Sequence, residues 1–100
     1  MKDASVVAVV DQLRSRFGAD ALLVVDHWEA DRCAIGLSRP DEPERLVYVC
    51  TFGKPPGRYD VSLELPPARG DDFPYTPAGD RSDLDFGELA TVVGEHLGLR

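Results

Sequence analysis

Residues 58–65, with the sequence Arg-Tyr-Asp-Val-Ser-Leu-Glu-Leu, alternate polar and apolar side chains throughout. Successive side chains of a β-strand point to opposite faces of a sheet, so this alternation predicts a strand with one face on a core and the other in water. Such strands are typical of antiparallel sheets, because parallel strands are usually covered on both faces. The stretch therefore predicts an antiparallel sheet with one covered face.

Helical periodicity is found towards both ends of the chain. Residues 4–17 carry valine, leucine and phenylalanine at helical spacing and are followed by Gly18, a residue that favours helix termination. Residues 83–97 show the same spacing, and Ser82 and Asp85 are interpreted as a variant of the capping box. Each pattern predicts one amphipathic helix.

Three more segments between the helices are predicted to be strands. They cover about 21–28, 32–38 and 45–52, and short loops rich in proline, glycine or charged residues separate them. A run of strands framed by helices indicates an α+β fold. We expect one domain over residues 1–100, ordered as helix, four-stranded antiparallel meander and helix, with both helices packed on one face of the sheet.

The register of these strands is predicted by matching apolar residues across the loops. A slip of one residue would turn every apolar side chain to the wrong face. Symmetric pairing about 39–44 places Leu37 opposite Leu46 and Cys33 opposite Cys50. The expected core face consists of Leu23, Val25, His27, Cys33, Ile35, Leu37, Leu46, Tyr48, Cys50, Phe52, Tyr59, Val61, Leu63 and Leu65.

The opposite face is expected to carry a tryptophan and two valines, which a solvated sheet face does not need. Residues 66–82 are rich in proline and glycine and are expected to form a long loop whose aromatic residues pack on something. Together these groups form the candidate interaction surface, with the members Trp28, Val47, Val49, Phe73 and Tyr75.

Imidazole and thiol groups fall on one predicted rung, at His27, Cys33 and Cys50. Zinc would accept these ligands, with His96 as a fourth, and the same residues could be drawn as a Cys-His catalytic pair. The chain lacks the closely spaced ligand pairs of most zinc sites, and nothing around the rung indicates an oxyanion hole. We interpret the cysteines as buried free thiols. A strained disulfide between Cys33 and Cys50 is the alternative.

Acidic residues gather before and within the second predicted helix, at Asp80, Asp83, Asp85 and Glu88. Calcium binds such oxygen ligands, but the spacing of an EF-hand is absent and helix capping explains Asp83 and Asp85. The sequence contains no recognised catalytic motif. We therefore expect no cofactor, no metal and no enzymatic activity.

The charge of the chain limits its partners. The 100 residues carry a net charge of −7, which repels nucleic acid and anionic membranes and favours a basic partner. We see no signal peptide and no apolar stretch of ~20 residues, and two cysteines do not make a disulfide framework. A cytoplasmic location is expected.

These features favour a small protein-binding module. Its helix–meander–helix plan is similar in outline to bacterial toxin-immunity and antitoxin-like proteins, a resemblance of fold that implies a protein partner. Two alternatives remain open. One is a self-associating domain with the open sheet face as dimer interface. The other is a small-molecule-binding or enzymatic domain with a pocket between the sheet and the 66–82 loop.

Overall fold

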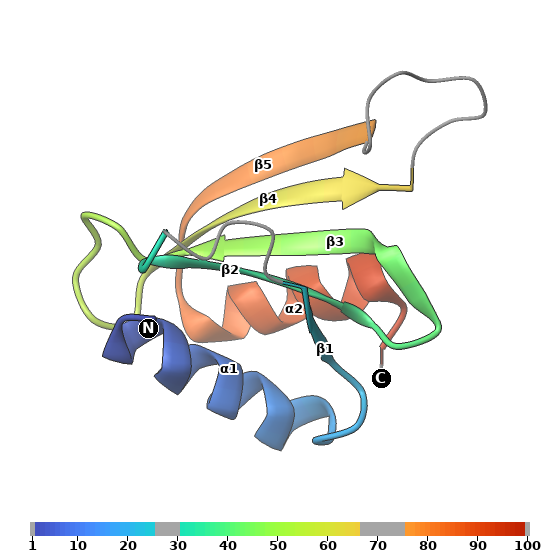
Figure 1. Ribbon diagram of the computed structural model, residues 1–100. Coiled ribbons are helices and arrows are strands. Elements are labelled where there is room, and N and C mark those ends of the chain that lie inside the picture. Colours follow the sequence, from blue (N-terminus) through green and yellow to red (C-terminus); the bar gives the residue numbers. More distant parts are fainter. Residues whose placement is uncertain (1, 26–30, 67–75, 100) are drawn as a thin grey trace.

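The computed structural model describes residues 2–25, 31–66 and 76–99 (Figure 1). These residues form an α+β fold with two helices and a five-stranded antiparallel sheet, whose spatial order is β1-β2-β3-β4-β5. Figure 1 shows both helices on the same side of the sheet. The elements are α1 (Ala4–Phe17), β1 (Leu23–Val25), β2 (Ala34–Arg39), β3 (Glu42–Cys50), β4 (Tyr59–Leu65), β5 (Thr76–Leu84) and α2 (Phe86–Leu97).

The fifth strand corrects the prediction of a four-stranded sheet. Strand β5 includes residues 76–82 of the segment 66–82 that was expected to be a loop, and it pairs with β4 at the edge of the sheet. Its sequence lacks an apolar alternation, and it contains Pro77 and Gly79, which edge strands tolerate and central strands do not. The strand conformation of β5 is therefore determined by its pairing with β4, which alternates polar and apolar residues, more than by the side chains of β5 itself.

Helix α1 has the bounds that the sequence predicts. Asp3 is its N-cap, because the Asp3 carboxylate accepts a hydrogen bond of 3.0 Å from the Ser5 backbone N–H. The backbone N–H of Gly18 bonds to the Arg14 carbonyl and closes the last turn. The buried side chains of the helix form one apolar stripe, made of Val6, Val9, Val10 and Leu13.

Helix α2 begins after its N-cap Asp85, three residues later than expected from Ser82, the first capping signal. Asp85 and Glu88 form a reciprocal capping box, with hydrogen bonds of 2.8 and 3.0 Å between each side chain and the other residue's backbone N–H. Ser82 belongs to β5 instead of the cap. Gly98 ends the helix in a left-handed conformation, with φ of 70°. Among the described residues, neither helix has the length and apolar character required to cross a membrane.

The predicted register is wrong by one residue at each of the three strand pairs that were predicted. The predicted opposition of Cys33 and Cys50 is therefore also wrong. The observed partners are Ser38 for Leu23, Ala34 for Cys50 and Glu64 for Leu46.

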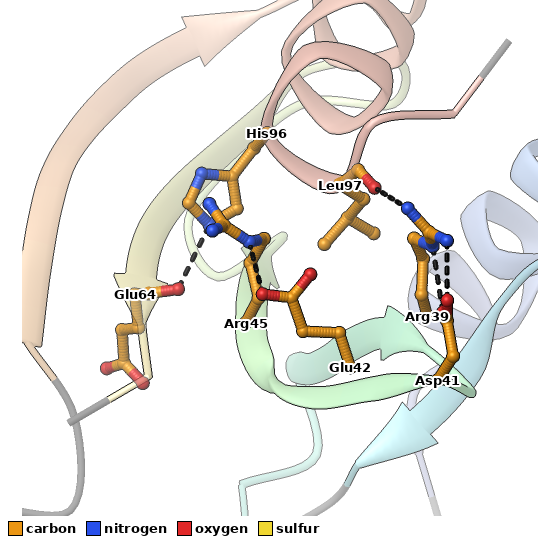
Figure 2. Close-up of polar contacts among 7 residues, drawn as sticks. All are labelled: Arg39, Asp41, Glu42, Arg45, Glu64, His96 and Leu97. Atoms are coloured by element: carbon orange, nitrogen blue, oxygen red, sulfur yellow. Dashed lines mark hydrogen bonds and ion pairs between the residues drawn. The ribbon is translucent and has the colours of Figure 1, made fainter.

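An asymmetric hairpin between β2 and β3 causes the slip at that pair. Arg39 lies opposite Glu42, but Leu37 lies opposite Val47, so the single residue at position 38 faces the four residues 43–46. Symmetric pairing about the loop cannot anticipate this irregularity. The Arg39 guanidinium binds both carboxylate oxygens of Asp41, at 2.9 and 2.6 Å, and also reaches the carbonyl at the end of α2 (Figure 2).

The corrected register places Val47 and Val49 in the core. Both side chains are 0% exposed, whereas the sequence placed them on the open face. The preceding residue, Leu46, is also fully buried. The run Leu46-Val47-Tyr48-Val49 is apolar at every position and so carries no alternation that could indicate which side faces the helices. The observed core cluster consists of Val6, Val9, Val10, Leu13, Leu22, Ile35, Leu37, Val47, Val49, Tyr59, Val61, Leu63, Leu84, Leu89, Ala90, Val93 and Leu97.

Strand β1 approaches β2 closely at Gly36. A Cβ atom on this residue would lie 2.4 Å from the carbonyl oxygen of Val25, a distance that real Cβ atoms do not adopt. Because the obstacle is backbone, a larger residue could be accommodated only by moving β1. Glycine at this position is therefore a requirement for the observed pairing of β1 with β2.

Candidate functional site

The structure does not place the five predicted members of the candidate interaction surface on one exposed face. Val47 and Val49 are core residues in contact with the helical layer and are unavailable to a partner. The other three members, Trp28, Phe73 and Tyr75, lie outside the described residues.

The two cysteines do not share a rung. Cys50 lies opposite Ala34, and the carbonyl of Cys33 accepts a hydrogen bond of 2.8 Å from the backbone N–H of Thr51. The two side chains consequently point to opposite faces of the sheet, which excludes the proposed cross-strand disulfide. Both are free, half-buried thiols, and His27 lies outside the described residues.

The acidic residues before α2 are occupied by structural contacts. Asp85 and Glu88 cap the helix. Asp83 adopts a left-handed backbone conformation, with φ of 56°, and its N–H donates to the Asp60 carboxylate at 2.9 Å. This hydrogen bond, assisted by the Lys54 ammonium at 3.1 Å, holds the pKa of Asp60 below its ordinary value. In the part of the chain that the structure describes, no group of potential metal ligands is assembled.

A groove of about 520 Å³ lies between the start of α1, the loop 51–58 and the start of α2. In Figure 1 this loop lies beside the N-terminal end of α1. One wall is the face of α1 that carries Ser5, Ala8 and Gln12. The other wall combines the basic side chains of Lys54 and Arg58 with aromatic and proline side chains, contributed by Phe52, Pro55, Pro56, Tyr59 and Phe86. We call it the α1–loop groove.

Hydroxyl groups and one carboxylate form the polar end of this groove. The Ser5 hydroxyl donates to Asp3 Oδ2 at 2.5 Å and lies 2.8 Å from the Thr51 hydroxyl. Thr51 in turn donates to the Cys33 carbonyl at 3.3 Å. The side-chain hydrogen bond from Ser5, followed by the one from its backbone N–H, lowers the pKa of Asp3. The carboxylate is therefore ionised at neutral pH, and the chain of contacts ties α1 to the end of β3.

The rim of the groove presents one exposed aromatic side chain. Phe52 is 76% exposed, the highest value among the large exposed apolar residues of the described chain. The loop that carries it is fastened at its far end, because Lys54 pairs with Asp60 at 3.1 Å and Arg58 donates to the carbonyl of Asp83 at 3.3 Å. Phe52 thus projects into solvent from a loop whose position is held by side-chain contacts.

The groove was not predicted from the sequence, because the shifted register placed Phe52 on the core face. The available signal was the pair Pro55-Pro56 between two aromatic residues, Phe52 and Tyr59. Such a pair restricts the backbone of a loop that carries large apolar side chains.

A second polar cluster, at the C-terminal end of α2, has a structural explanation. Basic side chains here lie close to acceptors in the last turn of the helix or in neighbouring strands (Figure 2). Arg45 pairs with Glu42 at 3.0 Å, and His96 Nε2 lies 3.0 Å from the carbonyl of Glu64. The His96 contact and the hydrogen bond from Arg39 to the Leu97 carbonyl fasten α2 to β4 and β2, and the Arg45–Glu42 pair lies within β3, so the cluster is explained as structural.

Comparison with known proteins adds no assignment. The chain matches no family model, and no curated protein or solved structure shows significant similarity to it. The functional argument therefore rests on the geometry of this chain.

Proposed function

We propose that the chain is a cytoplasmic protein-binding module without catalytic activity, and that the α1–loop groove receives a segment of a basic partner protein. The observation that carries this proposal is the exposed side chain of Phe52 at the rim of the groove. Large aromatic residues are enriched at the energetic centres of protein interfaces. Removing this ring from water on binding would stabilise a complex.

The groove is also organised before any partner arrives. The Lys54–Asp60 pair and the two prolines restrict the loop, while the Ser5–Thr51 contact fixes its base. A preorganised loop loses little conformational freedom on binding, so more of the contact energy contributes to affinity.

Electrostatics favour a basic partner over an acidic one. The net charge of −7 accelerates encounter with a positively charged surface and opposes binding to nucleic acid. Within the groove, the ionised Asp3 carboxylate stands beside two hydroxyl groups and can accept hydrogen bonds from a cationic side chain. Two basic residues also line the groove, and both are engaged within the chain, because Lys54 pairs with Asp60 and Arg58 donates to the carbonyl of Asp83. Trp28, Phe73 and Tyr75 stay as proposed further contacts of the same partner.

The volume of the groove also fits a small-molecule site, which makes this the rival function. A volume of about 520 Å³ falls within the range of ordinary ligand pockets, roughly 300–1,000 Å³. The sequence placed such a pocket between the sheet and residues 66–82, whereas the groove lies at the other end of β4, beside α1. The experiment below separates the two functions.

The test uses ¹⁵N-labelled protein titrated with defined nine-residue peptides rich in lysine, arginine and leucine, and with matched peptides in which glutamate replaces the basic residues. We expect the basic set to shift amide signals at 5–12 and 51–59, and Phe52→Ala to weaken that binding about tenfold or more. Leu23→Ala, which removes an exposed apolar side chain from β1, is the matched control.

Equal binding of the basic peptides to Phe52→Ala and wild type would contradict the proposal, as would preference for the glutamate peptides. Shifts at the same residues from a library of small aromatic or heterocyclic compounds, with none from any peptide, would support the small-molecule function instead.

A further inference from the structure

A second opening lies between α1 and the free edge of the sheet at β1. This cleft, of about 190 Å³, exposes part of the apolar layer between helix and sheet. Its apolar lining is entirely aliphatic and consists of Val6, Val7, Val10, Val24 and Ile35. We call it the α1–β1 cleft.

The described part of β1 comprises the three residues Leu23–Val25 and forms one side of the cleft, opposite α1. Val7 is 51% exposed and Val24 is 36% exposed, whereas the neighbouring Val6 is fully buried. Both exposed valines line the cleft.

The opposite edge of the sheet, at β5, is better protected against association with another chain. Strand β5 carries Pro77, two shifts of register and charged side chains such as Asp80 and Arg81, all of which discourage association. Of the two edges of the described sheet, only the β1 edge has exposed aliphatic groups and an open cleft.

We propose that the α1–β1 cleft docks a second copy of this chain, related to the first by a two-fold axis that passes beside Val7. A two-fold interface places the same residues on both sides, so a residue at the rim of its own cleft is brought to the cleft of its partner. Val7 stands at that rim and is more than half exposed. Each copy therefore inserts one branched aliphatic side chain into the other.

Three charged residues line the cleft, namely Lys2, Asp11 and Arg14. Val7 lies between the first two, five residues after Lys2 and four before Asp11, so these two opposite charges can pair across a two-fold axis at Val7, while Arg14 lies further along the helix. Two antiparallel copies of α1 crossing at Val7 bring Lys2 of each copy to Asp11 of the other. Lys2 already donates to the Asp31 carbonyl at 2.5 Å, but an ammonium group has three donors and can bind a carboxylate as well.

The size of the patch sets the expected strength. Stable dimers bury on the order of 800 Å² on each partner, and the proposed contact is centred on one helix face and the described residues of β1. We therefore expect a dissociation constant in the micromolar range, so that monomer and dimer coexist at accessible concentrations.

Sedimentation velocity of the full chain from about 5 to 500 µM tests the proposal, since this range brackets a micromolar constant. We expect concentration-dependent dimerisation that Val7→Asp abolishes. Lys2→Glu and Asp11→Lys should each weaken association about fivefold or more by creating like-charge contacts, and the double variant should restore it. Gln12→Ala, on the face of α1 that lines the other groove, is the matched control and should dimerise like wild type. Circular dichroism melts establish that each variant is folded.

A monomer at all concentrations would overturn the proposal. A dimer that tolerates Val7→Asp would place the contact elsewhere and overturn it equally. Failure of the double variant to restore association would refute the antiparallel arrangement. None of these results bears on the α1–loop groove, because the proposed function of that groove is tested separately, by peptide titration and by Phe52→Ala.

Discussion

Replacing Val49 with alanine tests the corrected register directly. The substitution removes two methyl groups from a side chain that is 0% exposed and packs within the core between sheet and helices. Burial contributes about 0.8 kcal/mol per carbon, and the cavity left behind adds to this loss, so the free energy of unfolding should fall by about 2–3 kcal/mol. In the register predicted from the sequence, the same side chain lies on the open face and its loss would cost about 0.5 kcal/mol or less.

Urea denaturation followed by circular dichroism measures this difference, and an unchanged slope against urea would show that the compactness of both states is retained. The melting temperature should fall by about 10–20 °C for a domain of this size. Ser62→Ala is the matched control, because Ser62 is half-buried on the opposite face of the neighbouring strand and should change stability by no more than about 0.5 kcal/mol. Equal losses for the two variants would refute the observed register.

Three further predictions follow from local contacts. Gly36→Ala should cost about 1–3 kcal/mol and expose β1 to hydrogen exchange, because the new Cβ meets the Val25 carbonyl; retained protection of β1 would contradict the close approach. Asp85→Ala should cost about 1 kcal/mol in a thermal melt by leaving the Glu88 N–H without its cap, and an unchanged melt would refute the capping box. Since the folded state lowers the pKa of Asp60 below 3.8, its stabilisation should be complete above that pH and lost as the pH falls through the lower, folded-state value. Asp60→Asn should be less stable than wild type at neutral pH, and the two should converge at low pH; a constant difference between their urea midpoints would exclude this linkage.

Local signals in the sequence determine the helices and β4. Caps and periodicity predict α1 from residue 4 to residue 17, and the structure confirms both bounds. Alternation in β4 is also confirmed, because Val61 and Leu63 are buried and the residues between them are half-buried. Val93, on the apolar side of α2, is fully buried. In each case a pattern contained in one segment is sufficient to specify its structure.

Features that depend on two segments were not predictable in the same way. The register of β2 against β3 depends on a turn held by Arg39 and Asp41, a contact that no apolar pattern reports. Strand β5 forms because β4 provides a partner, although its own sequence resembles a loop. Because the predicted register was off by one residue, Val47 and Val49 were assigned to the open face and not to the core. An error of one residue in register exchanges the side chains assigned to the two faces of a sheet.

The α1–loop groove illustrates the same limit for function. Its walls come from the start of α1, from 51–58 and from the start of α2, three segments far apart in the sequence. Only the exposure of Phe52, which depends on the register and on the fastening of the loop, identifies it as a candidate contact. Aromatic residues chosen from sequence alone could not be separated into core and surface groups.

Helix α1 connects the two proposed binding surfaces, and its geometry keeps them independent. At 3.6 residues per turn, its side chains fall on three faces roughly 120° apart. One face is buried against the sheet, one borders the α1–loop groove through Ser5, Ala8 and Gln12, and one borders the α1–β1 cleft through Val7 and Asp11. A dimer formed through the last face leaves the groove of each copy open. Two copies could then engage two partner segments at once, and a bivalent basic partner would be held more tightly than either groove alone could hold it.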